Sequence, residues 1–284
     1  MDLVRTVTEL KRELSSLRSR RKRIAFVPTM GNLHDGHVHL AQHARQHADA
    51  VVVSIYVNPL QFGPSEDFAA YPRTLEADMA KLRASGVELL FLPDDHEIYS
   101  RGRAAQTIVE VPAVSDILCG ASRPGHFRGV TTVVNRLFNL VSPDVALFGK
   151  KDYQQWLLIR LMVSDLGMPV EIIGVDTVRA ADGLALSSRN GYLSDAERRI
   201  APSLYATLTA IKGQMISEGC IPIGAEAEAV KMLSQHGFRP DYISIRRRCD
   251  LATPGSEDRE LVILAAAWLG RARLLDNVEV DLGR

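Results

Sequence analysis

Short apolar runs alternate with stretches of helical periodicity through the first 180 residues of the chain. Runs rich in β-branched residues predict buried strands at 24–27, 50–57, 87–92, 145–148 and 170–175. Helical spacing of apolar residues predicts helices around 37–48, 74–85, 129–141 and 152–167. Near-continuous apolar strands separated by helices indicate a parallel sheet covered on both faces. The pattern therefore predicts an α/β fold with a Rossmann-like, doubly wound sheet.

The pattern changes after about residue 177. A polar connection at 183–189 is followed by two long helical stretches, 195–218 and 224–236. Two strand-like runs, 242–245 and 261–268, then lead to a terminal segment, 272–280. We predict a Rossmann-like domain over residues 1–177 and a smaller α+β domain over residues 178–284, joined by a flexible loop.

Composition and charge narrow the class of partners. The 34 basic side chains balance the 34 acidic ones, so no global field attracts nucleic acid or an anionic membrane. Basic runs at 18–23 and 246–248 lack interleaved aromatic residues. They leave a nucleic-acid-binding protein only as an alternative, which salt-dependent RNA binding would support. We expect no nucleic-acid partner.

The cysteines and the apolar stretches bear on the compartment. Three cysteines, far apart and without C-x-x-C spacing, argue against a disulfide scaffold and against a Cys-rich zinc site. The amphipathic N-terminus lacks the apolar core of a signal peptide, and the longest apolar stretch, 261–269, is too short to span a bilayer. We expect a soluble, cytoplasmic protein with no membrane partner.

Candidate chemistry begins where the first strand meets a helix, in the sequence FVPTMGNLHDGH. His34 and His37 are nearly one turn apart, so a helix that begins at about Asp35 lets both face one ligand. Gly36 has no side chain and lets a triphosphate approach the backbone, where the helix N-terminus favours an anion. The motif predicts phosphate contact and nucleotide chemistry.

Three more histidines, His39, His43 and His47, follow at four-residue intervals. Imidazoles at that spacing on a helix can share a metal ion. No H-E-x-x-H sequence is present, however, and the stretch contains no glutamate that could serve as a general base. The surrounding alanine and glutamine residues favour a solvated polar helix face over zinc binding.

Two later loops also suit a polyphosphate. Gly149 permits close approach of a nucleotide, and one of the lysines that follow it can neutralise phosphate charge. Ser187, Ser188 and Arg189 lie in a glycine-tethered loop that suits a mobile clamp.

The segments 29–37, 58–63 and 149–152 each follow a predicted strand. Because parallel strands bind ligands at their carboxyl ends, we expect these three loops to converge on one crevice.

Six segments, in colinear order from about residue 24 to 278, carry a resemblance to one family. They are FVPTMGNLHDGH, YVNPLQFGPSEDFAAYPRT, SRPGHFRG, FGKKDYQQ, ADGLALSSRNGYL and AAWLGRARLLDN. Together they resemble the pantoate–β-alanine ligase (pantothenate synthetase) family of the nucleotidylyltransferase superfamily. The resemblance implies ATP-dependent condensation of (R)-pantoate with β-alanine through a pantoyl-adenylate, with release of pyrophosphate and then AMP. It also implies Mg²⁺, a homodimer, and nucleotide and pantoate binding by the first domain with a lid from the second.

The resemblance further implies roles for individual residues. ATP would be bound by Met30, Gly31, Asn32, Leu33, His34, Asp35, Gly36, His37, Gly149, Lys150, Lys151, Asp152, Val178, Leu186, Ser187, Ser188 and Arg189. The catalytic residues among them would be His34, His37, Lys151 and Arg189, with His37 as proton donor and phosphate stabiliser. Lys150 departs from the glutamate common in relatives and adds positive charge beside the phosphates.

The remaining implied roles concern the acceptor and the metal. Gln61 and Gln155 would bind pantoate, with Gln61 also near β-alanine, and Asp78 would contact Mg²⁺. Motifs lining the same cavity contain Asn58, Arg123 and His126. An alternative is a nucleotidyltransferase that moves a nucleotide onto a phosphorylated small-molecule acceptor. It accounts equally well for the histidines, but less well for two neutral glutamines suited to a small hydroxy acid.

Overall fold

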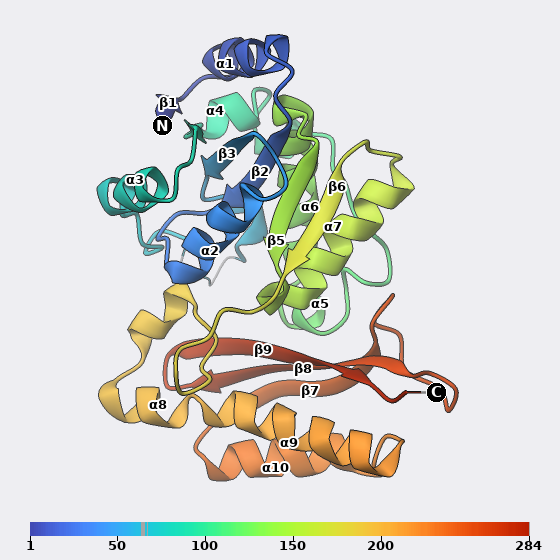
Figure 1. The fold of residues 1–284 in the computed structure, drawn as a ribbon. Coiled ribbons are helices and arrows are strands. Elements are labelled where there is room, and N and C mark those ends of the chain that lie inside the picture. Colours follow the sequence, from blue (N-terminus) through green and yellow to red (C-terminus); the bar gives the residue numbers. More distant parts are fainter. Residues whose placement is uncertain (64–65, 67, 284) are drawn as a thin grey trace. The chain divides into compact units, whose positions relative to one another are not determined.

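The computed structural model describes residues 1–63, 66 and 68–283. Positions 64, 65 and 67, inside the segment YVNPLQFGPSEDFAAYPRT, lie outside the described residues. The chain forms two compact units, each with its own sheet (Figure 1). The first unit comprises Met1–Lys150 and Leu158–Asp176, and the second comprises Lys151–Leu157 and Thr177–Arg284.

The first unit contains a six-stranded parallel sheet in the order β1-β4-β3-β2-β5-β6. Its strands are β1 (Asp2–Val4), β2 (Ile24–Thr29), β3 (Ala50–Ile55), β4 (Leu89–Phe91), β5 (Val145–Gly149) and β6 (Glu171–Val175). The strand order reverses beside β2, because the chain runs outward through β3 and later returns to place β5 on the other side. The predicted Rossmann-like fold is confirmed, and β2 and β5 flank the switch point where such sheets bind ligands.

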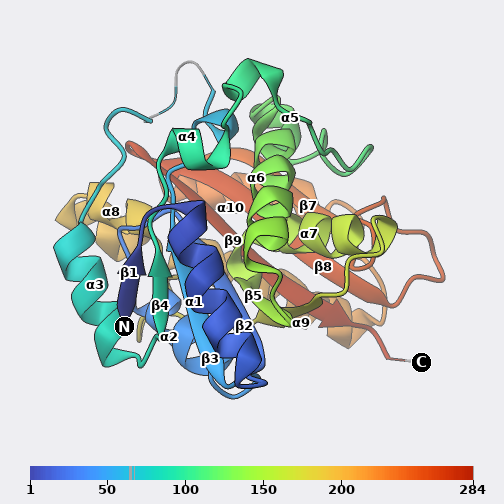
Figure 2. The same ribbon diagram turned by 90° about the horizontal axis from the view of Figure 1, so that it is seen from above.

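Helices cover both faces of this sheet. They are α1 (Val7–Ser19), α2 (Asp35–Ala44), α3 (Leu75–Ala84), α4 (Asp95–Ile98), α5 (Cys119–Ser122), α6 (His126–Val141) and α7 (Tyr153–Asp165), with α7 beginning in the second unit. Alternate strand residues such as Ala25 and Val27 join one core with α2 and α3. Phe26 faces the other side, 6.3 Å ring to ring from Phe138 of α6. Figure 2 shows α1 lying beside α6.

One strand of this sheet was not expected. Leu3 stands at near-helical spacing with the apolar residues after it, and no strand was predicted before residue 24. The helix begins only at Val7, because Thr6 accepts a hydrogen bond from the Glu9 amide and caps it. The residues before that cap form β1, which pairs with β4.

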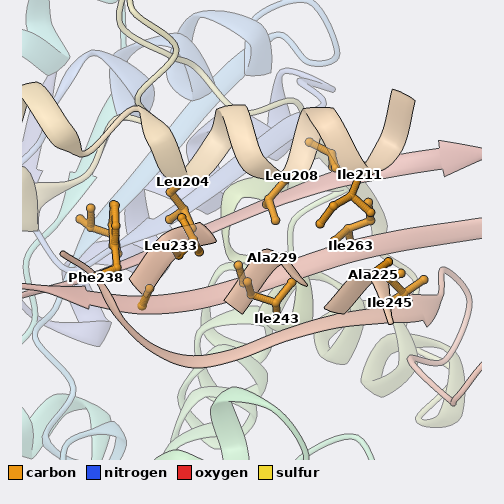
Figure 3. Close-up of a cluster of buried hydrophobic side chains, with 14 of the residues drawn as sticks. Leu204, Leu208, Ile211, Ala225, Ala229, Leu233, Phe238, Ile243, Ile245 and Ile263 are labelled. Carbon is orange, nitrogen blue, oxygen red and sulfur yellow. The ribbon is translucent and has the colours of Figure 1, made fainter. Parts of the chain in front are cut away.

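The second unit contains a three-stranded antiparallel sheet in the order β7-β8-β9. Its strands are β7 (Arg239–Arg247), β8 (Glu260–Leu269) and β9 (Ala272–Asp281). The helices α9 (Ser203–Glu218) and α10 (Ala225–Gln235) pack on it. Leu204, Leu208 and Ile211 of α9 contribute to a buried cluster with α10 and the strands (Figure 3). A smaller α+β part at this end of the chain agrees with the prediction from sequence.

The long helix predicted at 195–218 is wrong in one respect. It is divided into α8 (Asp195–Ile200) and α9, which begins after Pro202. Proline has no backbone N–H and its ring obstructs a preceding turn, so it favours the start of a new helix. Among the described residues, no helix is long and apolar enough to cross a membrane.

Candidate active site

The turn between β2 and α2 carries the histidine motif. Gly31 and Asn32 both have positive φ, +80° and +49°, and thus reverse the chain within two residues. A Cβ atom at Gly31 would lie 3.0 Å from the Ile55 side chain, so only glycine fits this turn without displacement. The helix then begins at Asp35, which meets the condition for both histidines to face one ligand, and His34 is its N-cap residue.

His34 and His37 close a reciprocal capping arrangement at the start of α2. His34 Nδ1 accepts a hydrogen bond from the Gly36 N–H at 3.1 Å, and His37 Nδ1 accepts one from the His34 N–H at 3.3 Å. The two rings lie 4.1 Å apart, centroid to centroid. Because Nδ1 is an acceptor in both neutral rings, the ring proton belongs on Nε2. Each imidazole thus has an Nε2–H donor of the kind a phosphate oxygen accepts.

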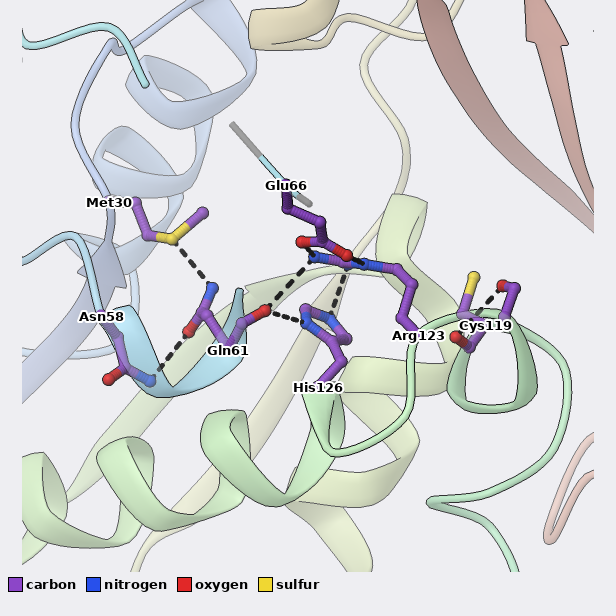
Figure 4. Close-up of polar contacts among 8 residues, drawn as sticks. Met30, Asn58, Gln61, Glu66, Cys119, Arg123 and His126 are labelled. Atoms are coloured by element: carbon purple, nitrogen blue, oxygen red, sulfur yellow. Dashed lines mark hydrogen bonds and ion pairs between the residues drawn. The ribbon is translucent and has the colours of Figure 1, made fainter. Parts of the chain in front are cut away.

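Gln61 lies against this turn. It ends a short 3₁₀ helix, η1 (Pro59–Gln61), that follows β3. Its Nε2 donates to the sulfur of Met30 at 2.8 Å, and its Oε1 accepts from Asn58 Nδ2 at 3.2 Å (Figure 4). The structure therefore brings together two segments that the sequence places some 30 residues apart.

Asn58 is buried, and both the oxygen and the nitrogen of its side-chain amide are hydrogen-bonded. Its Oδ1 accepts from the Leu60 N–H at 3.3 Å and from the Tyr99 hydroxyl at 2.7 Å, and its Nδ2 also donates to the Gly129 carbonyl at 3.0 Å. Burial raises the pKa of Tyr99 far above its ordinary value, so this hydroxyl remains a donor. Asn58 thereby holds the amide of Gln61 in one orientation.

Arg123 and His126 hold the backbone of Gln61 from the other side. Arg123 donates to the carboxylate of Glu66 at 2.7 and 2.6 Å and to the Gln61 carbonyl at 3.3 Å. His126 Nδ1 lies 2.8 Å from that carbonyl, and its Nε2 lies 3.0 Å from Arg123 (Figure 4). A carbonyl only accepts, so Nδ1 carries the proton and Nε2 accepts from the guanidinium.

Glu66 and Gly129 also support this candidate site, although neither was predicted from the sequence. Burial acts to raise the pKa of Glu66, but hydrogen bonds and charge from Arg123 outweigh it and leave the pKa below its ordinary value. At Gly129, a Cβ atom would lie only 2.3 Å from the Leu60 carbonyl oxygen, so α6 packs directly on η1. In the sequence, the only indication of a role is that Glu66 lies in the segment YVNPLQFGPSEDFAAYPRT and Gly129 in the segment SRPGHFRG.

The first unit is hollowed at the same edge of its sheet. A pocket of about 360 Å³ lies where β2, β3 and β4 end. Its lining includes Met30 and Gly31 from the histidine turn, Tyr56 after β3, and Asp78 of α3. Asp78 is almost fully buried, with 1% of its surface exposed. The ligand-binding edge expected for a doubly wound sheet therefore has an open cavity beside the histidine motif.

The segment after β5 is divided between the units. Gly149 ends β5, which lies beside β2 in the sheet, and Lys150 Nζ lies 3.2 Å from the Asp176 carboxylate. The additional charge of Lys150 is thus partly neutralised within the first unit. In the second unit, Lys151 Nζ lies 3.6 Å from Asp152, and Gln155 lies half-buried on α7.

The Ser-Ser-Arg loop is a closed hairpin of the second unit. The Leu186 N–H donates to the Val178 carbonyl at 3.0 Å, next to an antiparallel bridge between Arg179 and Ala185. Ser187 then caps a 3₁₀ helix, η4 (Ser188–Tyr192), by accepting from the Arg189 N–H at 3.3 Å. These bonds place the Ser-Ser-Arg sequence at the end of a defined hairpin.

Two adjacent residues of β9 anchor both parts of the second unit's candidate site. The carboxylate of Asp276 accepts from both terminal nitrogens of Arg179, at 2.6 and 2.7 Å, and the Arg179 guanidinium lies 3.5 Å from the ring centroid of Tyr205. Asn277 Nδ2 donates to the Lys151 carbonyl at 3.0 Å. No role was predicted for Asp276 or Asn277, although both lie at the end of the quoted segment AAWLGRARLLDN.

Two of the remaining histidines, His39 and His43, lie on α2, and His47 lies in the turn after the helix ends at Ala44. The rings of His39 and His43 are 6.1 Å apart, and the Nε2 atoms of His43 and His47 are 3.3 Å apart. Burial, with charge from the two neighbours, lowers the pKa of His43. Within residues 1–63, 66 and 68–283, no group of three or more His, Cys, Asp or Glu side chains is arranged to hold a metal ion.

A parallel doubly wound sheet, with paired imidazoles on the turn at its switch point, defines a nucleotide-binding protein of the Rossmann-like class. Comparison with known proteins narrows this class. The family model for pantoate-beta-alanine ligase matches residues 2–279, and the chain belongs to that family.

Curated relatives and solved structures agree over nearly full length. The pantothenate synthetase of Shewanella amazonensis is 57% identical over 272 residues, which cover 96% of each chain. That of Azotobacter vinelandii is 55% identical and covers 99% of this chain and 100% of its own. The crystal structure of pantothenate synthetase from Thermus thermophilus matches with a TM-score of 0.90, 45% identity and full coverage of both chains. The Francisella tularensis ligase, solved with β-γ ATP and β-alanine, matches with a TM-score of 0.81, 33% identity and coverage of 98% and 97%.

Proposed function

We propose that this protein condenses (R)-pantoate with β-alanine at the expense of ATP, through a pantoyl-adenylate. The observation that carries the proposal is the match of a single family model to residues 2–279. The paired histidines at the switch point of the sheet supply chemistry suited to such a reaction.

In the first half-reaction, the pantoate carboxylate attacks the α-phosphorus of ATP and pyrophosphate leaves. Negative charge accumulates on phosphate oxygens in the transition state, and donors aimed at that charge accelerate the step. We assign this role to the Nε2–H groups of His34 and His37, with charge from Lys151 and Arg189. The hydroxyls of Ser187 and Ser188 would also contact ATP.

In the second half-reaction, the amine of β-alanine attacks the acyl carbonyl of the adenylate and AMP leaves. Neutral amide donors suit the hydroxyls and carboxylate of pantoate without repelling a second, zwitterionic substrate. We assign pantoate binding to Gln61 and Gln155, and a β-alanine contact to Gln61. The fixed orientation of the Gln61 amide between Asn58 and Met30 supports this role.

Mg²⁺ is proposed as part of the MgATP substrate. Carboxylate oxygens are ligands that Mg²⁺ favours, but both oxygens of Asp78 already accept backbone hydrogen bonds. Asp78 therefore does not fit the role of metal ligand, and no step is assigned to an ion there. A homodimer and a cytoplasmic location are also proposed, since the family resemblance implies the first and use of cellular ATP fits the second.

A two-stage assay tests the proposed function. Protein, MgATP and pantoate should release pyrophosphate, and later addition of β-alanine should yield AMP and pantothenate. A matched reaction without pantoate should release little pyrophosphate. Pyrophosphate release that ignores pantoate, or a stable nucleotide-containing product without AMP, would contradict ligation and would instead fit a nucleotidyltransferase.

A further inference from the structure

The backbone of the histidine turn is held from behind by one buried carboxylate. Asp78 Oδ2 accepts from the Asn32 N–H at 2.9 Å, and Asp78 Oδ1 accepts from the Leu33 N–H at 2.8 Å. The Thr74 hydroxyl adds a third hydrogen bond, to Oδ1 at 3.1 Å. We infer that Asp78 is a positioning residue, whose carboxylate holds the turn and, through it, the two histidines in place for ATP.

The geometry of the turn explains why an anion is needed there. The consecutive N–H groups of Gly31, Asn32 and Leu33 all point into the protein, the first of them to Thr29 Oγ1 at 3.2 Å. Successive amides in a left-handed turn form a concave site that attracts negative charge. Here Asp78 fills that site, so these amides are engaged by the protein and are not left to meet a phosphate.

A second side chain of the same helix holds the other side of the Leu33 residue. Lys81 Nζ donates to the Leu33 carbonyl, so α3 contacts both the N–H and the C=O of one residue. Asp78 and Lys81 are three residues apart and therefore project from the same face of α3. This leaves Leu33 little freedom to rotate.

The position of Leu33 determines the position of the imidazoles. Leu33 directly precedes His34, and the His34 N–H donates to His37 Nδ1. A shift of the Leu33 backbone therefore moves the N-cap of α2 and, with it, both rings. Phosphate contact consequently depends on the imidazoles, while the amides before them serve the turn.

Asp78→Asn tests this role, because it replaces one acceptor oxygen with a donor that faces a backbone N–H. The rate measured in this test, that of pyrophosphate formation, rests on the proposed function. We expect pantoate-dependent pyrophosphate formation to fall on the order of 100-fold, as misplaced catalytic groups do. The Mg²⁺ concentration giving half the maximal rate should stay as in wild type. Amide hydrogen exchange at Asn32 and Leu33 should become faster.

Glu76→Gln is the matched control, since Glu76 is an exposed acid in the same first turn of α3. It should change neither the rate nor the exchange. A near-wild-type rate in Asp78→Asn would overturn the inference, because Asp78 would then have no role in catalysis. A rate restored by excess Mg²⁺ would also overturn it, because Asp78 would then be a metal ligand. Should that variant not fold, Thr74→Val retains the carboxylate and removes one donor. Unchanged exchange at Leu33 and an unchanged rate in Thr74→Val would equally overturn it.

The two proposals fail in distinguishable ways. If the wild-type protein forms no pyrophosphate from pantoate and MgATP, the proposed function fails. Amide exchange in Asp78→Asn would still report whether Asp78 holds the turn, since that measurement needs no substrate.

Discussion

At the level of single residues, His34 and His37 differ in the backbone amide from which each ring accepts a hydrogen bond. His34 accepts a hydrogen bond from an amide two residues ahead, whereas His37 accepts one from the His34 backbone. Both arrangements favour the neutral ring with a proton on Nε2. His37 is therefore proposed to act as a hydrogen-bond donor at the phosphates.

Replacing His37 with Ala should slow adenylation much more than it weakens ATP binding. Loss of one donor to a transition-state oxyanion typically costs roughly 100- to 1,000-fold in rate. Single-turnover pyrophosphate formation and nucleotide affinity, measured on the same preparation, separate the two effects. His39→Ala, an exposed histidine on the same helix, is the control. A large affinity loss with normal turnover would refute the assigned role.

The Glu66–Arg123 ion pair should make stability depend on acid. The pKa of Glu66 is lower in the folded protein than its ordinary value of 4.5. Its stabilisation is thus present above about pH 4.5 and is lost as the pH falls through the folded pKa. Glu66→Gln should lower the free energy of unfolding at neutral pH by roughly 1 kcal/mol or less. Denaturant titrations should show the difference from wild type shrinking in acid; a gap independent of pH would contradict this.

Among the secondary-structure elements, α6 supports the candidate pantoate site through its close contact with η1. The absent side chain at Gly129 lets the helix backbone meet the Leu60 carbonyl, next to Gln61. Any added atom must displace η1, since both contacting groups belong to the backbone.

Gly129→Ala should therefore raise the KM for pantoate while leaving ATP affinity nearly unchanged. We expect a rise on the order of 10-fold, together with a loss of stability of roughly 1–3 kcal/mol from overpacking. Steady-state kinetics with each substrate varied, and thermal unfolding, provide the measurements. Gly213→Ala in α9, where a Cβ atom meets nothing within 4 Å, should keep wild-type kinetics. A pantoate KM unaffected by Gly129→Ala would show that η1 does not set the pantoate site.

The hairpin that carries Ser187 and Arg189 has more internal support than a polar loop suggests. The sequence predicts a mobile clamp, because two hydroxyls and a guanidinium in a glycine-tethered loop suit a polyphosphate. Its anchor is Arg179, whose partner Asp276 lies almost 100 residues later in the chain. No local pattern announces a pair of that separation. Any closing motion of this segment is therefore expected to involve the neighbouring strand β9.

For the chain as a whole, the patterns that repeat over many residues were predictable. Alternation of apolar strands with helices identified the parallel sheet, and the change of pattern near residue 177 identified the α+β part. The strand β1 and the break at Pro202 were missed, because each depends on one or two residues. The helix predicted around 37–48 is present as α2, which begins at Asp35 and ends at Ala44.

The residues of the candidate site also differ in how far the sequence alone predicts them. Residues inside contiguous motifs, such as His34, His37 and Ser187, can be proposed as site residues from local sequence, and their hydrogen-bond partners are near neighbours in the chain. Asp78 was named only as a Mg²⁺ contact and Asp276 was given no role, since the backbone amides and the guanidinium that they bind are brought to them by folding. A carboxylate on a helix looks alike in sequence whether it binds a metal, meets solvent or holds a turn.

The division of α7 between the two units limits where the gene can be cut into two separately expressed parts. This helix begins in the second unit and ends in the first, since residues 151–157 belong with the chain after Thr177. A coding sequence bisected between residues 176 and 177 would yield a downstream polypeptide without those residues. Asn277 would then lose the Lys151 carbonyl to which it donates. Split-gene reporters and exchanges between relatives should therefore carry residues 151–157 from the same parent as the segment after 177.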